Sequence, residues 1–294
     1  MNEVCVAHLV REKNGLAPFE RFLGTYRANP AGAEHDLLII FKGFSQSHVP
    51  DGYETALAGM PHKRYFVEDV GLDIGPYLEV ARHLQYRYFC FFNSFSQILA
   101  PDWLRNMRHW ITRPGVGIVG ATASYQSVSS DFHDYRLIEK QETFKDRLRI
   151  IKRFILYLAK IHGRFPPFPN YHIRTNAFMA ARETFSRLNQ GKIRFKWDAY
   201  GFESGRNSLT WQIMRMGLSP IVVDKDGNGY EKEHWFESET FWLKEQKNLL
   251  VADNQTAAYA EGDSTLRTRL SFHAWRRWPD GTPRQDFPKD AETK

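Results

Sequence analysis

The chain has 294 residues, of which 42% are hydrophobic and 25% charged, as in an ordinary globular protein. This length allows one large α/β domain or two small ones, and no apolar stretch is long enough to span a bilayer. The net charge of +6 and the pI of about 9.2 favour anionic partners: phosphates, nucleic acid or a membrane surface.

Two features bear on the compartment. Cys5 and Cys90 both lie in apolar runs, which favours two buried thiols over a disulfide framework. The start of the chain carries Glu3 and has too short an apolar segment for a signal peptide. We therefore expect a cytoplasmic protein.

Apolar runs rich in β-branched and aromatic residues alternate with segments of helical periodicity. Strands are predicted at 4–10, 35–44, 63–71, 88–94, 115–125 and 219–227, and helices at 16–26, 74–85 and 102–111. Residues 171–185 are expected to form a strand that runs into a helix, and residues 196–217 a loop followed by a helix. This alternation predicts a doubly wound α/β domain with a mostly parallel sheet.

Ligands bind such sheets at the carboxyl ends of the strands. The polar residues that follow the strands therefore matter most: Arg11, Lys42, Glu68, Asp69, Asp73, Asn93 and Ser94.

The segment 136–164 is basic, and within it Phe144, Leu148, Ile151, Ile155 and Leu158 follow a helical spacing. One interpretation is a helix with a core face and a solvated face. The other is an interfacial helix on anionic lipid, where each cation contributes about 1 kcal/mol. The tail from residue 261 again combines arginine with tryptophan, and its polar end is expected to be disordered.

Three motifs follow one another along the chain. The first contains Asp69, Gly71, Asp73, Gly75 and Tyr77. The second is Asn93-Ser94-Phe95-Ser96, with Pro101 after it, and the third is His172-Ile173-Arg174-Thr175-Asn176. Their order resembles bacterial GT-A-type glycosyltransferases, and within them the rhamnan-synthesis (RgpF-like) and related cell-surface polysaccharide transferases. The resemblance covers roughly residues 4–225, and Asp69 stands where that family tends to have asparagine.

The resemblance implies a Rossmann-like, mostly parallel sheet flanked by helices. A GT-A domain at 1–260 would contain a basic helical insertion at 136–165, and a basic extension would follow at 261–294. The implied activity is transfer of a hexosyl or deoxyhexosyl group from a nucleotide sugar to a hydroxyl of a surface polysaccharide, such as capsule or lipopolysaccharide, or of a lipid-linked glycan. An inverting mechanism with a carboxylate base and peripheral attachment to the inner face of the membrane are also implied.

Many nucleotide-sugar enzymes end the strand before the second motif in two aspartates that hold a metal ion. Here the neutral Asn93 and Ser94 stand at that point, and both would be weak ligands for Mg²⁺ or Mn²⁺. We therefore expect no prosthetic group, and an activity that is independent of a divalent metal or only weakly dependent on one. His234, in the position of a late histidine ligand in metal-dependent relatives, is not expected to bind one.

Candidate site residues follow from these motifs. Glu203 is the expected base and Asp198 its rival, although either carboxylate could simply be favoured by the first turn of a helix. The residues expected to bind the donor are His8, Arg11, Lys42, Asp69, Gly71, Asp73, Asn93, Ser94 and Ser96. The residues expected to bind the sugar or acceptor are His172, Arg174, Asn176 and Arg206.

Several of these residues also have a purely structural interpretation. Asn93 and Ser96 could cap the next helix, and Asp73 could be the N-cap of the helix that begins at Ile74. His172 could be a buried structural histidine.

Two other functions remain open at this point. A transferase-like fold could serve only as a sugar- or nucleotide-binding partner in an assembly. The net charge of +6 would also suit nucleic acid, but the chain has no helix-turn-helix, zinc-finger or RNP signature.

Overall fold

The computed structural model describes residues 2–45, 48–131, 148, 151–152, 154–155, 161, 163–189, 191, 193 and 196–284. Within these residues the main sheet has eight strands in the order β11-β10-β6-β9-β4-β1-β2-β3. Its strands are β1 (Val4–Arg11), β2 (Asp36–Lys42), β3 (Lys63–Val67), β4 (Tyr88–Phe92), β6 (Val116–Gly120), β9 (Ala177–Ala181), β10 (Ser219–Val223) and β11 (Gly229–Tyr230). The pairs β3-β2, β2-β1, β1-β4 and β6-β10 are parallel, whereas β9 runs antiparallel to both β4 and β6. The predicted α/β fold with a mostly parallel sheet is confirmed.

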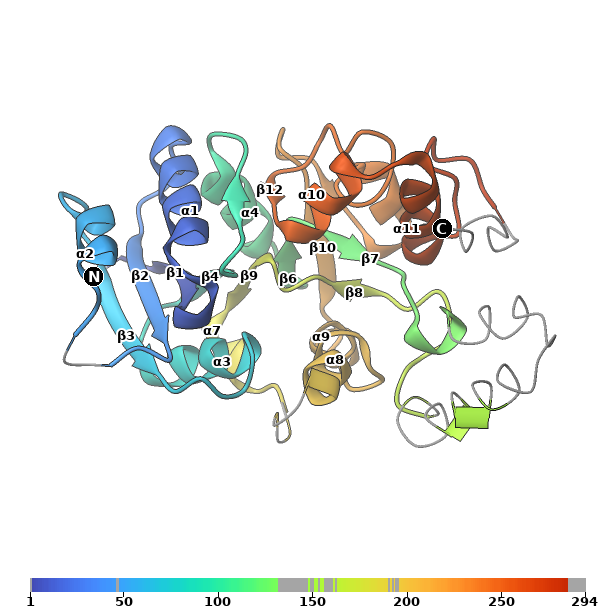
Figure 1. Ribbon diagram of the computed structural model, residues 1–294, viewed down its shortest axis with the longest axis horizontal. Coiled ribbons are helices and arrows are strands. Elements are labelled where there is room, and N and C mark those ends of the chain that lie inside the picture. Colours follow the sequence, from blue (N-terminus) through green and yellow to red (C-terminus); the bar gives the residue numbers. More distant parts are fainter. Residues whose placement is uncertain are drawn as a thin grey trace.

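Helices cover both faces of this sheet (Figure 1). One face packs on α1 (Leu16–Ala28), α2 (Asp51–Leu57) and α4 (Trp103–Ile111). The other packs on α3 (Ile74–His83), α7 (Arg182–Ser186) and α9 (Leu209–Arg215). The central strands are therefore buried on both sides, which explains their continuous apolar sequences.

Strand β4 illustrates how a central strand is buried on both faces. Phe89 and Phe91 point into one hydrophobic cluster, whereas Cys90 and Phe92 point into the other. Successive side chains of a strand alternate between faces, so both sets must be apolar when both faces are covered. The strand ends at Phe92, and the first polar side chain after it is Asn93, at the carboxyl edge of the sheet.

The C-terminal part covers the β6-β10 end of the sheet (Figure 1). It contains the 3-10 helix η3 (Lys232–Ser238), α10 (Asn254–Glu261) and α11 (Ser264–Trp275). Short strands tie it to the rest, because β12 (Val251–Ala252) pairs with β5 (Gln97–Ile98). Trp275 of α11 is only 4% exposed and belongs to the same cluster as Phe89 and Phe91. Helix α11 is thus part of the packed core, and residues 285–294 lie outside the described residues.

Three predicted elements differ from the structure. The expected strand at 115–125 is broken after Gly120, and β7 (Ala123–Ser124) pairs instead with β8 (His172–Ile173). The strand expected at the start of 171–185 is likewise divided into β8 and β9, and the helix expected after it is α7. The expected loop before α9 is a helix, α8 (Lys196–Ser204). Most of the basic insertion lies outside the described residues, and no helix in the described ranges is long and apolar enough to cross a membrane.

Candidate functional site

A cleft of about 500 Å³ opens at the carboxyl edge of the sheet. It collects side chains from four separate parts of the chain: the loop before α3, the end of β4, the β8–β9 segment and α8. Six of the predicted site residues line it: Asp73, Asn93, His172, Arg174, Asn176 and Glu203. The remaining wall comes from the segment that begins at β7, with Ser124, and from the C-terminal part, including Phe241, Trp242 and Asp253.

Glu203 lies near the end of α8, not in its first turn. The interpretation as a first-turn acid is therefore wrong for Glu203, since the favourable end of the helix dipole is the other one. The hydroxyl of Thr175 donates a hydrogen bond to Oε1 of Glu203 at 2.6 Å. Burial raises the pKa of the Glu203 carboxyl, and the nearby Asp73 raises it further, against the opposing effects of Thr175 and Arg174.

Asp73 immediately precedes α3, but its side chain makes no capping hydrogen bond. Asp73 is thus the N-cap residue of α3, as the sequence allowed, but its carboxylate does not cap the helix. Burial raises the pKa of Asp73, and the charges of Lys42 and Arg11 partly offset that effect. The backbone before it is turned by Gly71 with φ +72°, where an added Cβ would lie 3.3 Å from the Cα of Gly75.

Basic side chains bind the loop that carries Asp73 through its residue Asp69. Arg11 donates to both carboxylate oxygens of Asp69, at 2.7 and 3.0 Å, and Lys13 lies 2.7 Å from Oδ2. These partners, Arg11 above all, hold the pKa of Asp69 far below its usual range. Lys42 lies 3.9 Å from Asp69 and donates to the carbonyl of Leu72.

Lys42 is 1% exposed, so it cannot reach a ligand directly. Lys42 therefore supports the loop, and it does not make the predicted contact with the donor. Asp69 and Gly71 line a neighbouring hollow of about 850 Å³, together with the aromatic rings of Phe44 and Phe66. Sequence reasoning missed Lys13, since it is one of many exposed lysines.

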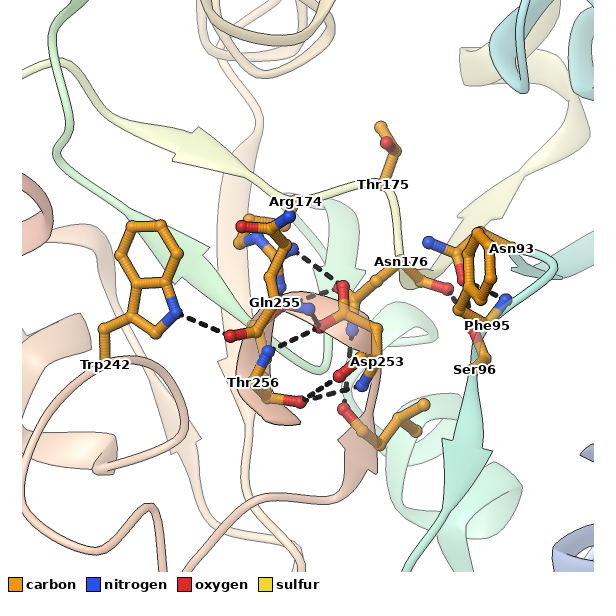
Figure 2. Close-up of polar contacts among 12 residues, drawn as sticks. Asn93, Phe95, Ser96, Arg174, Thr175, Asn176, Trp242, Asp253, Gln255 and Thr256 are labelled. Carbon is orange, nitrogen blue, oxygen red and sulfur yellow. Dashed lines mark hydrogen bonds and ion pairs between the residues drawn. The ribbon is translucent and has the colours of Figure 1, made fainter. Parts of the chain in front are cut away.

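The end of β4 forms a tight polar turn (Figure 2). Oδ1 of Asn93 accepts a hydrogen bond from the amide of Phe95 at 3.0 Å, and the Ser96 hydroxyl lies 3.0 Å from the same atom. Ser96 is also 2.7 Å from the carbonyl oxygen of Asn176. The next element is the strand β5, so the interpretation of Asn93 and Ser96 as helix caps is wrong. Ser94 and Ser96 are buried and are not among the residues that line the cleft.

Arg174 is fixed on several sides. Its Nη2 lies 2.7 Å from Oδ2 of Asp253, its Nη1 donates to Thr122, and its guanidinium stacks on Phe241 at 4.1 Å from the ring centroid. The other carboxylate oxygen of Asp253 accepts the amides of Gln255 and Thr256 and so caps α10 (Figure 2). A cap before α10 is readable in the sequence, but the pairing with Arg174 is not.

The two predicted histidines differ. Nδ1 of His172 lies 2.8 Å from the carbonyl oxygen of Asn170, and burial lowers the pKa of this residue to about 4. The ring is therefore neutral at physiological pH, with the proton on Nδ1 and Nε2 as an acceptor. His8 is fully buried under α1, where its ring stacks on Phe22 at 3.6 Å. The expected donor contact by His8 is excluded, because the side chain points into the core and not to the edge.

Two other candidates lie elsewhere. Asp198 pairs with Arg164 at 3.6 Å and, with Arg206, lines a separate shallow hollow next to α8. Neither residue is among those that line the cleft. Of the two carboxylates proposed as base, only Glu203 lines it.

A divalent metal, which many nucleotide-sugar enzymes hold at the end of this strand, does not fit the described side chains. Within the described residues no group of three or more His, Cys, Asp or Glu side chains is arranged to hold one. Oδ1 of Asn93 already serves two donors of its own turn. His234 is exposed and lies 3.0 Å from Glu237.

No protein-family model matches the chain, and no curated protein matches it. Solved structures with similar folds include a mannosyltransferase, PcManGT from Pyrobaculum calidifontis, in complex with GDP-Man and Mn²⁺. It has 16% identity and a TM-score of 0.47, and the alignment covers 81% of this chain but only 59% of that one.

The galactosyltransferase LgtC, in complex with donor and acceptor sugar analogs, has 9% identity and a TM-score of 0.39 over 68% of this chain and 70% of its own. TarS of S. aureus has 12% identity and a TM-score of 0.32 over 41% of this chain and 35% of its own. Similarities at this level assign neither an activity nor a substrate to the chain.

Proposed function

We propose that the chain is a GT-A-type glycosyltransferase that moves a sugar from a nucleotide-sugar donor to a hydroxyl of an acceptor glycan, with inversion at the anomeric carbon. The observation that carries the proposal is the convergence of Asp73, Asn93 and Glu203 on one cleft at the carboxyl edge of an α/β sheet. That edge is where such sheets bind their ligands. Each of the three residues belongs to a different segment that the sequence had already marked.

Glu203 is the proposed base. Thr175 occupies its Oε1, which leaves Oε2 for the acceptor hydroxyl. A pKa raised by burial makes this carboxylate a stronger base than a free glutamate. During transfer the acceptor oxygen bonds to the anomeric carbon and the bond from that carbon to the diphosphate breaks. The hydroxyl proton passes to Glu203, and the electron pair leaves with the diphosphate.

The donor would lie across the edge of the sheet. The hollow lined by Phe44, Phe66 and Gly71 suits the nucleotide, since it offers aromatic faces beside a backbone open to close approach. The exposed Arg82 lines this hollow, and Arg11 and Lys13 lie beside it at Asp69; these cations can offset diphosphate charge. Asp73 and the Asn93 amide would then bind hydroxyls of the sugar.

We propose an RgpF-like polysaccharide transferase that transfers a hexosyl or deoxyhexosyl group to a surface polysaccharide or a lipid-linked glycan. Peripheral contact with an anionic membrane fits an acceptor of this kind. Leu148, Ile151 and Ile155 are 50%, 55% and 61% exposed at helical spacing, next to the exposed Lys152. Apolar side chains flanked by cations are the composition of an interfacial helix.

The test is sugar transfer by Glu203→Gln. Glutamine keeps an oxygen for Thr175 but cannot take a proton, so we expect a loss of about 10²–10⁴-fold in kcat with donor affinity retained. Glu20→Gln, an exposed change of the same kind on α1, is the control. Near-normal turnover by Glu203→Gln would rule out Glu203 as the base.

The second candidate is a catalytically inactive sugar- or nucleotide-binding protein of a polysaccharide-assembly complex. It is favoured by the lack, in the described part of the chain, of a ligand set for a metal. Donor binding without transfer or hydrolysis, across UDP, GDP, CMP and dTDP sugars, would select it over the transferase.

A further inference from the structure

The charges that face the cleft are unbalanced. Among the described residues that line it, the acids are Asp73, Glu203 and Asp253, and Arg174 is the only arginine or lysine. Arg174 is already paired with Asp253 at 2.7 Å, and that carboxylate is 1% exposed. His172 is neutral because burial lowers its pKa to about 4. Within the described part of the chain, Asp73 and Glu203 are therefore left without an ion-pair partner inside the cleft.

The cations outside the cleft offset this imbalance only in part. The charges of Lys42 and Arg11 lower the pKa of Asp73 against the larger effect of burial, but Lys42 is buried and Arg11 is paired with Asp69. The chain as a whole carries a net charge of +6. The acidic character of the cleft is thus local and runs against the charge of the protein.

The carboxylate of Asp73 also lacks a hydrogen bond or ion pair within the described residues. It makes no capping bond to α3. Among the described residues it also has no ion pair, since Arg11 and Lys13 bind Asp69. Lys42 donates to the carbonyl of Leu72. A carboxylate that lines a cleft with its oxygens unused offers them to donors on a ligand. Hydroxyl and ammonium groups are such donors.

We infer that the sugar bound between Asp73 and Glu203 carries no acidic group: it is a neutral or amino sugar, and uronic or sialic acids are rejected. This inference rests on the proposed transferase function and names its donor class. A carboxylate of the ligand would lie a few ångströms from two carboxyls of the protein. At that distance the repulsion exceeds the roughly 1.4 kcal/mol that corresponds to tenfold in affinity.

The test uses pairs of donors that differ only at C6 of the sugar: UDP-glucose with UDP-glucuronate, and GDP-mannose with GDP-mannuronate. Affinities are measured by calorimetry for the wild type, for Asp73→Asn and for Asp51→Asn. Asp51 is exposed in the first turn of α2 and is the matched control. UDP and GDP alone account for the contribution of the nucleotide.

We expect the neutral member of the pair whose base is accepted to bind at least tenfold more tightly than the acidic one. Asp73→Asn should reduce that ratio at least threefold, and Asp51→Asn should leave it unchanged. Equal binding of both members, with transfer intact, would overturn the inference and leave the transferase standing. A ratio that survives in Asp73→Asn would also overturn it.

A second measurement separates the inference from the function. Methyl glucoside, glucosamine and glucuronate are tested without nucleotide by saturation-transfer NMR. Suppose that methyl glucoside and glucosamine bind while glucuronate does not, in a protein that binds no nucleotide sugar. That result would support the acidic sugar site and contradict the transferase function. If none of the three sugars and neither donor pair binds, the inference and the proposed function are both wrong.

Discussion

The hydroxyl of Thr175 donates a 2.6 Å hydrogen bond to Oε1 of Glu203, and this contact joins the segment between β8 and β9 to the end of α8. It fixes one oxygen of the carboxylate and leaves the other for a substrate. It also lowers the pKa of Glu203 against the raising effect of burial. The contact therefore orients the proposed base and counteracts part of the effect of burial on its pKa.

Thr175→Val should shift the acidic limb of the kcat/KM profile to higher pH. Without the hydroxyl the pKa of Glu203 rises further, so less of the carboxylate is ionised at a given low pH. A hydrogen bond to a charged group contributes about 1.5–3 kcal/mol, so we expect about a tenfold loss on the acidic limb. The alkaline plateau should change less, and Thr175→Ser should restore the wild-type profile. An unshifted limb would show that another group titrates there.

Removal of divalent metal should leave transfer intact. The expectation follows from the donor set: the described residues hold no cluster of three ligands, and Oδ1 of Asn93 is engaged in its own turn. Turnover is measured in EDTA and after addition of Mn²⁺. Loss of activity in EDTA that Mn²⁺ restores would contradict this prediction and would require ligands from the substrate.

Much of the fold was predictable because central parallel strands are apolar on both faces. The run from Tyr88 to Phe92 and the run from Val4 to Val10 were therefore visible as strands, and the polar residues after them marked the ligand edge. The helix α8 was missed because Gly201, a weak helix former, lies within its short sequence. Its boundaries are set by packing, with Phe202 only 3% exposed.

The positions of site residues were predictable only where the neighbouring sequence indicates them. His8 shows a signal that was available, since Val6, His8 and Val10 alternate with Ala7 and Leu9 and must share one covered face. The pairing of Arg174 with Asp253 joins residues 79 positions apart and depends on how the C-terminal part folds back. No local pattern carries that information.

The Arg174–Asp253 pair should contribute more to stability than the helix cap built on the same aspartate. Asp253→Asn keeps an oxygen to cap α10 but leaves the mostly buried Arg174 without a counter-charge, which should cost about 2–4 kcal/mol. Thr256→Val removes the hydroxyl that accepts from the amide of Asp253 and donates to its carbonyl, at about 1 kcal/mol. Urea denaturation compares the two variants, and a smaller effect for Asp253→Asn would show that the ion pair adds no net stability.

His8→Leu should stabilise the protein, and more strongly as the pH falls. Both ring nitrogens of His8 are buried without a hydrogen-bond partner among the described residues, and burial lowers its pKa from 6.5 to about 3. Because the unfolded chain binds the proton more readily, the wild type loses stability as pH falls below about 6.5. The gap between variant and wild type should widen by about 1.4 kcal/mol per pH unit down to pH 4. His48→Leu, at an exposed site, is the control, and a gap that stays constant with pH would show that His8 gains a proton or a partner in the folded state.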